Sequence, residues 1–248
     1  MGPRHADTPL NSGQPLFATT QWSVVLAAGA KREAGAREAL TRLCEVYWPP
    51  LYAYVRRRID DVHEAQDLTQ AFFSHLIEKH TIGRAQRDRG RFRAFLLTAL
   101  KNFLANEWHK ARTDRRGGGR AALSLDFAAA ESRLQIEPSH ELTPEKVYER
   151  RWVLTLLDNV LEALRLELAQ AGKLDEFEQF KSALTGEMSA ADYDRAADAL
   201  GITSAAAKQA AYRMRKRYRG LFRDAVAQTV AAGEDLDEEI GRLQAILE

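Results

Sequence analysis

Apolar side chains recur at helical spacing in the stretch "AAAKQAAYRMRKRYRGLF" (205–222). They follow one another at steps of four, three, four and three residues, and they are Ala207, Ala211, Met214, Tyr218 and Leu221. The other side of such a helix carries mostly cationic and polar side chains, namely Lys208, Gln209, Tyr212, Lys216 and Arg219. The spacing predicts an α-helix with one face against a core and a cationic face towards solvent.

The same periodicity continues along the chain, whereas the apolar–polar alternation typical of strands is nearly absent. Helices are expected at 19–29, 34–47, 51–59, 62–79, 92–112, 144–170, 173–185, 190–200, 204–220 and 235–247. Thr143 followed by Pro144 marks a helix start, because threonine caps free amides and proline fits the first turn. Pro49 and Pro50 are expected to interrupt or bend the helical segment around them. We therefore predict an all-α protein.

Stretches of glycine-rich, polar or acidic sequence divide these helices into groups. "RRGGGR" (115–120) ends the first group, and weakly patterned, increasingly acidic sequence follows it. This organisation predicts two helical domains joined by a flexible linker. The expected boundaries are a disordered N-terminus at 1–18, a first domain at 19–116, the linker at 117–143, a second domain at 144–223 and an acidic C-terminal tail at 224–248.

The distribution of charge is more informative than its sum, which is only +1 over 248 residues. Lysine and arginine outnumber aspartate and glutamate by 11 to 3 across 84–120 and by 7 to 0 across 203–223. The ratio is reversed, at 1 to 7, across 224–248. Two basic segments in a neutral to acidic chain indicate two surfaces that contact a polyanion.

Several classes of protein are disfavoured by the sequence. Cys44 is the only cysteine, which excludes an internal disulfide and fits a reducing cytoplasm. No apolar run is long enough to cross a membrane, and the first residues lack the apolar core of a signal peptide. The histidines have no metal-ligand spacing, and "GGGR" is not followed by the lysine and hydroxyl residue of a P-loop. We expect a cytoplasmic protein without metal, cofactor or catalytic activity.

The stretch "YDRAADALGITSAAAKQAAYRMR" (193–215) predicts a helix-turn-helix. Ala197 would allow the two helices to approach closely, and Gly201 would supply the conformational freedom for the turn. Ile202 and Ala207 would fill the angle between the helices, and Ser204 would cap the second helix.

The second helix of this motif has the chemistry to enter a DNA major groove. Its candidate contacts to bases, sugars and phosphates are Ser204, Lys208, Gln209, Tyr212, Arg213 and Lys216, with Arg219 as a further phosphate contact. The alternative is an ordinary helix pair with a solvated cationic face.

The first basic segment combines cations with amides and aromatic rings. Asn102 and Asn106 are four residues apart and share one helical face. Rings stack on unpaired bases, amides bind base edges and cations neutralise phosphates, so this face suits melted DNA. The candidate contacts are Lys101, Asn102, Asn106, Trp108, Lys110, Arg112, Arg115 and Arg116. The alternative is that the aromatic residues belong to the core, as expected for Phe92, Phe95 and Phe103, with Trp108 undecided.

Four stretches together resemble the extracytoplasmic-function (ECF) group of bacterial RNA polymerase sigma factors. "CEVYWPPLYAYVRRRI", "EAQDLTQAFFSHLIE" and "FRAFLLTALKNFLANEWHKAR" are similar to the helices of region two in that family. "YDRAADALGITSAAAKQAAYRMRKRY" is similar to the helix-turn-helix of region four. The resemblance covers roughly 40–222 and implies a subunit that binds core RNA polymerase and directs promoter recognition and melting.

The resemblance also implies residue roles. The surface that docks on the clamp helices of the largest polymerase subunit would include Asp67, Gln70, Phe73 and Leu76. The first basic segment would melt the −10 element of the promoter, with Asn102 reading a flipped base. The second would read the −35 element, and the linker would pass through the polymerase cleft.

Some features depart from the family pattern. "HEAQDL" has fewer acids than usual before its aspartate, as in some relatives that depend on control by a kinase. An anti-sigma factor is a further candidate partner. The acidic tail would either shield the basic helix across 208–219 or form a solvated terminal helix. A stand-alone helix-turn-helix regulator is the alternative function, but it leaves the first basic segment unexplained and normally needs a dimer.

Overall fold

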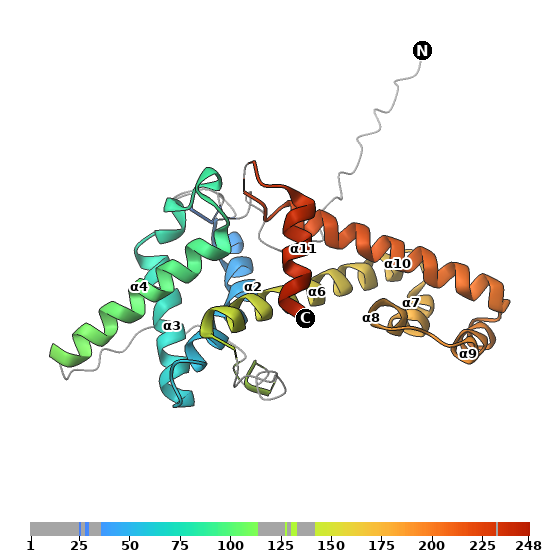
Figure 1. The fold of residues 1–248 in the computed structure, drawn as a ribbon, viewed down its shortest axis with the longest axis horizontal. Helices are drawn as coiled ribbons and strands as arrows, with labels where there is room; N and C mark the ends of the chain where they lie inside the picture. Colours follow the sequence, from blue (N-terminus) through green and yellow to red (C-terminus); the bar gives the residue numbers. More distant parts are fainter. Residues whose placement is uncertain are drawn as a thin grey trace, which may run out of the picture.

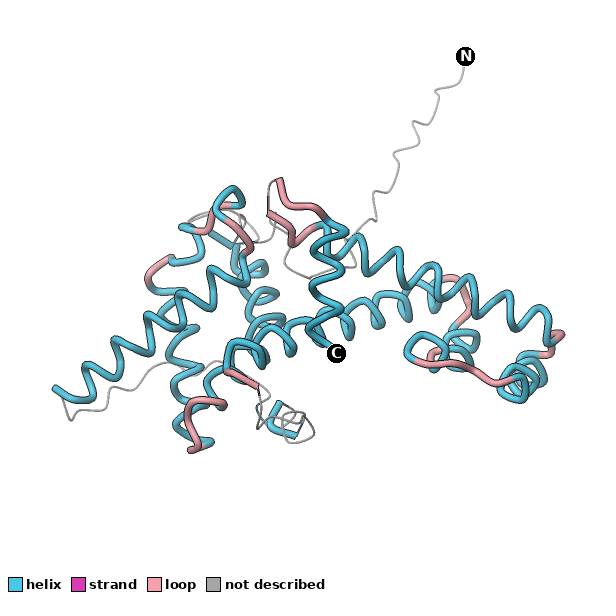
Figure 2. Tube along the Cα trace, in the orientation of Figure 1, coloured by secondary structure: helices cyan, strands magenta, loops and turns pink. Residues whose placement is uncertain are grey.

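The computed structural model describes residues 25, 28–29, 36–113, 127, 130–132, 142–231 and 233–248. All regular structure among these residues is helical, as Figure 2 shows, which confirms the all-α prediction. The main helices are α2 (Ala36–Arg56), α3 (Val62–Glu78), α4 (Phe92–Thr113), α6 (Pro144–Gln170), α7 (Leu174–Phe180), α8 (Ser182–Thr185), α9 (Ala190–Leu200), α10 (Ser204–Ala227) and α11 (Leu236–Leu247). Two short 3-10 turns, Thr81–Arg84 and Arg87–Arg89, join α3 to α4. The expected disordered N-terminus and most of the expected 19–29 helix and linker lie outside the described residues.

Helix α2 is one continuous element that contains both Pro49 and Pro50. The expectation that these prolines interrupt the helix is therefore wrong. Side chains on both sides of them are buried in the same core, among them Tyr47 at 1% exposure and Leu51 at 0%. Burial of several large side chains outweighs the hydrogen bonds that two prolines remove, because each fully buried side chain contributes roughly 1.5–3 kcal/mol.

Helix α6 begins where the sequence predicted. Thr143 is its N-cap and accepts a hydrogen bond from the Lys146 amide at 3.3 Å, with Pro144 in the first turn. The helix has 27 residues and is thus about 40 Å long. Its length lets one element contact both groups of helices.

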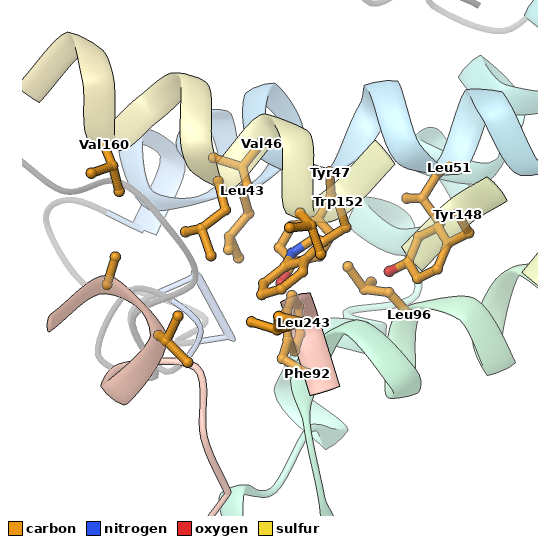
Figure 3. Packing of buried hydrophobic residues seen from close by; sticks show 14 of the residues in the cluster. Leu43, Val46, Tyr47, Leu51, Phe92, Leu96, Tyr148, Trp152, Val160 and Leu243 are labelled. Carbon is orange, nitrogen blue, oxygen red and sulfur yellow. The ribbon is translucent and has the colours of Figure 1, made fainter. Parts of the chain in front are cut away.

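The core is continuous from the first group of helices to the second. α6 packs against α2, α10 and α11, and α2 also packs against α3. Figure 3 shows Tyr47 of α2, Phe92 of α4, Trp152 of α6 and Leu243 of α11 gathered in one cluster. In Figure 1 α4 lies at one end of the molecule, and α9 with the start of α10 lies at the other. The two basic helices are therefore held apart by a packed framework.

The α9–α10 pair has the geometry expected for a helix-turn-helix, with two corrections at the turn. Gly201 adopts φ 63°, the left-handed conformation that glycine favours, and Ala197 is 3% exposed. The N-cap of α10 is Thr203, which accepts from the Ala206 amide, so the prediction of Ser204 as the cap is wrong. Ile202 is 39% exposed and does not fill the angle between the helices, because the turn directs it to solvent.

The acidic tail folds as the expected helix, α11, and packs against α6 and α10. Its acids pair with arginines outside 208–219. Asp237 pairs with Arg223, and Glu239 contacts Arg91 and Arg93 at the start of α4. These contacts correct the expectation that the acids across 234–239 shield the cationic face of α10.

Candidate nucleic-acid interface

The exposed face of α4 carries the two predicted amides. Asn102 and Asn106 are both exposed, one turn apart, and are thus free to meet a ligand. Lys101, beside them, is held by the Glu145 carboxylate at the start of α6, with 2.7 Å between Nζ and Oε1. This hydrogen bond is the largest cause of a lowered Glu145 pKa. A DNA phosphate would compete with Glu145 for Lys101.

Trp108 lies between core and solvent, with 37% of its surface exposed. The Arg58 guanidinium stacks on its ring at 4.9 Å from the centroid and donates to the Tyr54 hydroxyl at 2.8 Å. Tyr54 is fully buried, so this chain of contacts ties Trp108 to the framework. The aromatic residues predicted for the core are confirmed for Phe92 and Phe103, at 1% and 4% exposure, while Phe95 is half-buried.

The other predicted contacts of the first segment are described only in part. Lys110 and Arg112 belong to α4 by their backbone, but their side chains are not among those the structure describes. Arg115 and Arg116 lie outside the described residues.

The cationic face of α10 is exposed as predicted. Its exposed side chains are Lys208, Gln209, Tyr212, Arg213, Lys216 and Arg219. Tyr212 is 61% exposed, an unusual position for a large ring. Within the described part of the chain no ion pair involves the four cations of this set. The opposite stripe is buried, with Ala207 and Ala211 at 0% exposure, so the amphipathic pattern is confirmed.

Three other arginines of the second basic segment serve internal contacts. Arg215 donates to the Tyr193 hydroxyl at 2.6 Å, and Arg217 forms a two-point contact with Glu167. Arg223 pairs with Asp237 of the tail. Roughly half of the cations in this segment therefore stabilise the fold. The other cations are exposed and can contact a ligand.

Ser204, one of the predicted DNA contacts, lies at the first position of α10 and is half-buried. Its hydroxyl donates to the Asp194 carboxylate of α9. This bond fastens the turn between the two helices and would have to open if Ser204 contacted DNA.

The four residues assigned to polymerase docking do not form one surface. Asp67 is exposed and Gln70 is half-buried, whereas Phe73 and Leu76 are each 2% exposed. The docking role of Phe73 and Leu76 is corrected on this ground, because both lie on the face of α3 that packs into the core beside α2 and α4. Ile77, which is 36% exposed, is the apolar side chain that this end of α3 does present.

The described residues of the expected linker are packed on α2. Phe127 meets the rings of Trp48 and Tyr52 edge to face at 5.4 and 5.0 Å. Glu131 accepts hydrogen bonds from the Tyr52 hydroxyl at 2.8 Å and from Arg56 Nη2 at 3.0 Å. The hydrogen bonds from Arg56 are the largest cause of a lowered pKa of Glu131. The pKa of Tyr52 is raised to about 12, mainly by burial and secondly by its hydrogen bond to Glu131.

The described residues offer neither a metal site nor a membrane-spanning helix. No group of three or more histidine, cysteine or acidic side chains there could hold a metal ion. None of the described helices is long and apolar enough to cross a membrane. Cys44 is half-buried, and burial raises the pKa of its thiol to about 11, so it is a poor nucleophile.

Residues important for the α4 face were also missed by the sequence analysis. Arg58 and Glu145 contact Trp108 and Lys101 from other helices. They are 50 and 44 positions away from these partners, and no periodic signal in the sequence links positions so far apart. Only the charge of Arg58, in the run "RRR", marked it at all.

Comparison with known proteins gives one match. Residues 43–113, less than a third of the chain, match the family model described as sigma-70 region 2. No curated protein and no solved structure matches the chain significantly. The matched segment includes the last two thirds of α2 and the whole of α3 and α4, with the exposed amide face of α4. Residues 43–113 are therefore similar to region 2 of the sigma-70 family.

Proposed function

We propose that the chain is a sigma factor of the ECF group, a non-catalytic subunit that binds core RNA polymerase and directs promoter recognition and melting. The observation that carries the proposal is the sigma-70 region 2 match, which covers the helix whose exposed face combines amides, cations and a half-exposed tryptophan. Such a face suits single-stranded bases better than closed duplex.

In this proposal α4 binds the melted −10 element through Asn102, Asn106 and Trp108, and Lys101 joins them when Glu145 is displaced. The exposed positions of both amides support these roles. Asp67 and Gln70 of α3 are the accessible members of the polymerase-docking set, and they would meet the clamp helices of the largest subunit.

The α9–α10 pair would bind the −35 element as a region-four domain. Its exposed set of Lys208, Gln209, Tyr212 and Arg213 supports this role, because all four lie in the first three turns of the second helix. That is the part of a recognition helix that reaches base edges in the major groove.

The second candidate is a stand-alone helix-turn-helix regulator. The exposed cationic face of α10 and the left-handed turn at Gly201 favour it. It predicts binding to duplex DNA in the absence of polymerase, and it gives no role to the amide face of α4.

Run-off transcription with purified core polymerase tests the proposal. If the chain is a sigma factor, core polymerase produces a discrete, template-dependent transcript only when the chain is added. The chain also co-elutes with core polymerase in gel filtration. The variant Asp67→Asn tests the docking surface, because it removes one exposed charge there and is expected to weaken co-elution. Duplex binding without any transcript and without co-elution would favour the regulator instead.

A further inference from the structure

Arg91 stands directly before α4 and in line with its exposed amide face. Its carbonyl accepts a hydrogen bond from the Phe95 amide at 3.2 Å, so it already follows the register of the helix. Eleven residues separate it from Asn102, which corresponds to three turns and about 16 Å along the axis. Ala94 and Thr98, which lie between them on the same side, are both exposed. Arg91 is thus positioned to extend the candidate nucleic-acid interface towards the start of α4.

The C-terminal segment covers this arginine. Its Nη2 lies 2.8 Å from Glu234 Oε1 and 2.9 Å from Glu239 Oε2, and its side chain is only 22% exposed. Its Nε is buried and has no hydrogen-bond partner among the described residues. The guanidinium is therefore bound by two carboxylates, but one of its donors is left unsatisfied.

The two covering acids differ in how firmly they are held. Glu239 is fully buried and also contacts Arg93 and Arg242. Glu234 is 31% exposed and lies in the turn before α11, next to Gly233 with its φ of 84°. Besides Arg91, Glu234 accepts one hydrogen bond, from the Ala231 amide at 3.1 Å. Glu239 anchors the segment, and Glu234 is the member that can leave Arg91 without unpacking α11.

We propose that Arg91 is a DNA-phosphate contact of the α4 face and that Glu234 is an intramolecular cover that competes with the phosphate for it. The inference rests on the proposed function, because it extends the same interface. A carboxylate and a phosphate offer a guanidinium the same pair of oxygen acceptors, so one replaces the other without change in the arginine. Both neighbouring ligands of Arg91 are anionic, and the next candidate contact on the same face, Lys101, is likewise bound by a glutamate.

The cover sets the apparent affinity for DNA. If a site is free in only a fraction of the molecules, its apparent Kd equals the intrinsic Kd divided by that fraction. Removing the charge of Glu234 should therefore tighten binding, and the gain should depend on Arg91. Each phosphate contact to a single strand contributes about 0.7 to the slope of log K against log salt.

The experiment measures fluorescence anisotropy of a labelled, mixed-sequence single-stranded DNA of about 20 nucleotides, titrated with the full chain between 50 and 200 mM salt. Four proteins are compared: the unaltered chain, Glu234→Gln, Arg91→Gln and the double variant. Glu238→Gln is the matched control, since it removes the same charge four residues away in the same segment. Circular dichroism melting of each variant shows that it is folded.

Glu234→Gln is expected to bind at least about threefold more tightly than the unaltered chain and Glu238→Gln. Introducing Arg91→Gln into that variant should abolish the gain and reduce the salt slope by about 0.7. Equal binding by Glu234→Gln and Glu238→Gln, or a gain that survives Arg91→Gln, overturns the cover while leaving the sigma function intact. If no folded variant binds DNA and none supports run-off transcription, the proposed function fails as well.

Discussion

The side chains on the exposed face of α4 are restrained to different degrees. Asn102 and Asn106 project into solvent, whereas Lys101 is paired with Glu145 and Trp108 is stacked under Arg58. The amides are therefore ready to bind a base at no cost in existing contacts. A phosphate that approaches the lysine competes with the Glu145 carboxylate.

Asn102→Ala is expected to reduce open-complex formation at least about fivefold, because one lost amide–base contact is worth about 1–3 kcal/mol. Binding of the closed promoter should change little.

Lys208→Ala should show the reverse, weakening closed-promoter binding at the −35 element. Permanganate footprinting of melted thymines measures the first step, and gel-shift titration with duplex DNA measures the second. Glu187→Gln, an exposed change between α8 and α9 and outside both candidate faces, is the control. Equal effects of Asn102→Ala and Lys208→Ala on both steps would contradict the division of roles.

Gly201 and Gly220 allow a matched test of the turn between α9 and α10. Neither has any atom within 4 Å of the place where a Cβ would stand, so only backbone conformation distinguishes them. Gly201→Ala should lower the free energy of unfolding by about 1 kcal/mol, because its φ of 63° is strained for alanine. Gly220→Ala, in the interior of α10, should raise it by a similar amount. Urea unfolding measures both, and a destabilised Gly220→Ala would contradict the account.

Among the elements, those with a strong local signal could be predicted from the sequence. The Thr143–Pro144 start of α6 and the amphipathic stripe of α10 depend on residues within a few turns of one another, and both are confirmed. The continuity of α2 through Pro49 and Pro50 could not be predicted, because it depends on packing against distant helices. Phe73 is a different case, because the apolar pattern of α3 places it on the core face, where it is buried, and its docking role came only from the family resemblance.

The candidate site was predictable in its ligand-facing residues and not in their partners. The cations and amides of α4 and α10 are local in sequence, so their faces followed from helical period. The pairing of Glu239 with Arg93 joins positions 146 residues apart, and nothing in the sequence marks those two as neighbours. The same holds for Glu131, whose contact with Arg56 spans 75 positions.

The Glu131 contact to α2 should be visible in the pH dependence of stability. Hydrogen bonds from Arg56 lower the pKa of Glu131 in the folded chain below its usual value of about 4.3. A carboxyl group with a lowered folded-state pKa stabilises the fold above the unfolded pKa and loses this effect as pH falls through the folded value. The stability advantage of the unaltered chain over Glu131→Gln should therefore be full above about pH 5 and shrink below about pH 4. Urea unfolding across this range measures it, and a constant difference would exclude the contact.

On the scale of the whole molecule, the two groups of helices share one continuous core. Tyr148 of α6 donates from its hydroxyl to the Arg93 carbonyl of α4 at 2.9 Å, and Arg93 stacks on the Trp152 ring at 4.3 Å from its centroid. α11 completes this contact from the C-terminal side with Glu239 and Leu243. In Figure 1 α11 lies over α6, between α4 and the end of α10 that carries α9.

Glu239→Gln is expected to destabilise this junction by about 3 kcal/mol or more, because it leaves buried arginines without their carboxylate. Glu238→Gln, an exposed neighbour, should change the free energy of unfolding by less than about 0.5 kcal/mol. Urea unfolding compares the two, and hydrogen exchange at the start of α4 should accelerate in the first variant alone. Equal stability of both variants would show that the buried cluster contributes nothing.

The unbroken course of α6 has a consequence for how this chain can vary. The helix is fixed to α2 and α4 around Trp152 and to α10 through Leu157 and Glu167. One residue inserted between Trp152 and Leu157 would turn everything beyond it by about 100° and advance it by about 1.5 Å. The cationic face of α10 would then point in another direction relative to the amide face of α4. Point substitutions in that stretch preserve the relative orientation of the two ends of α6. An insertion or deletion there changes this orientation.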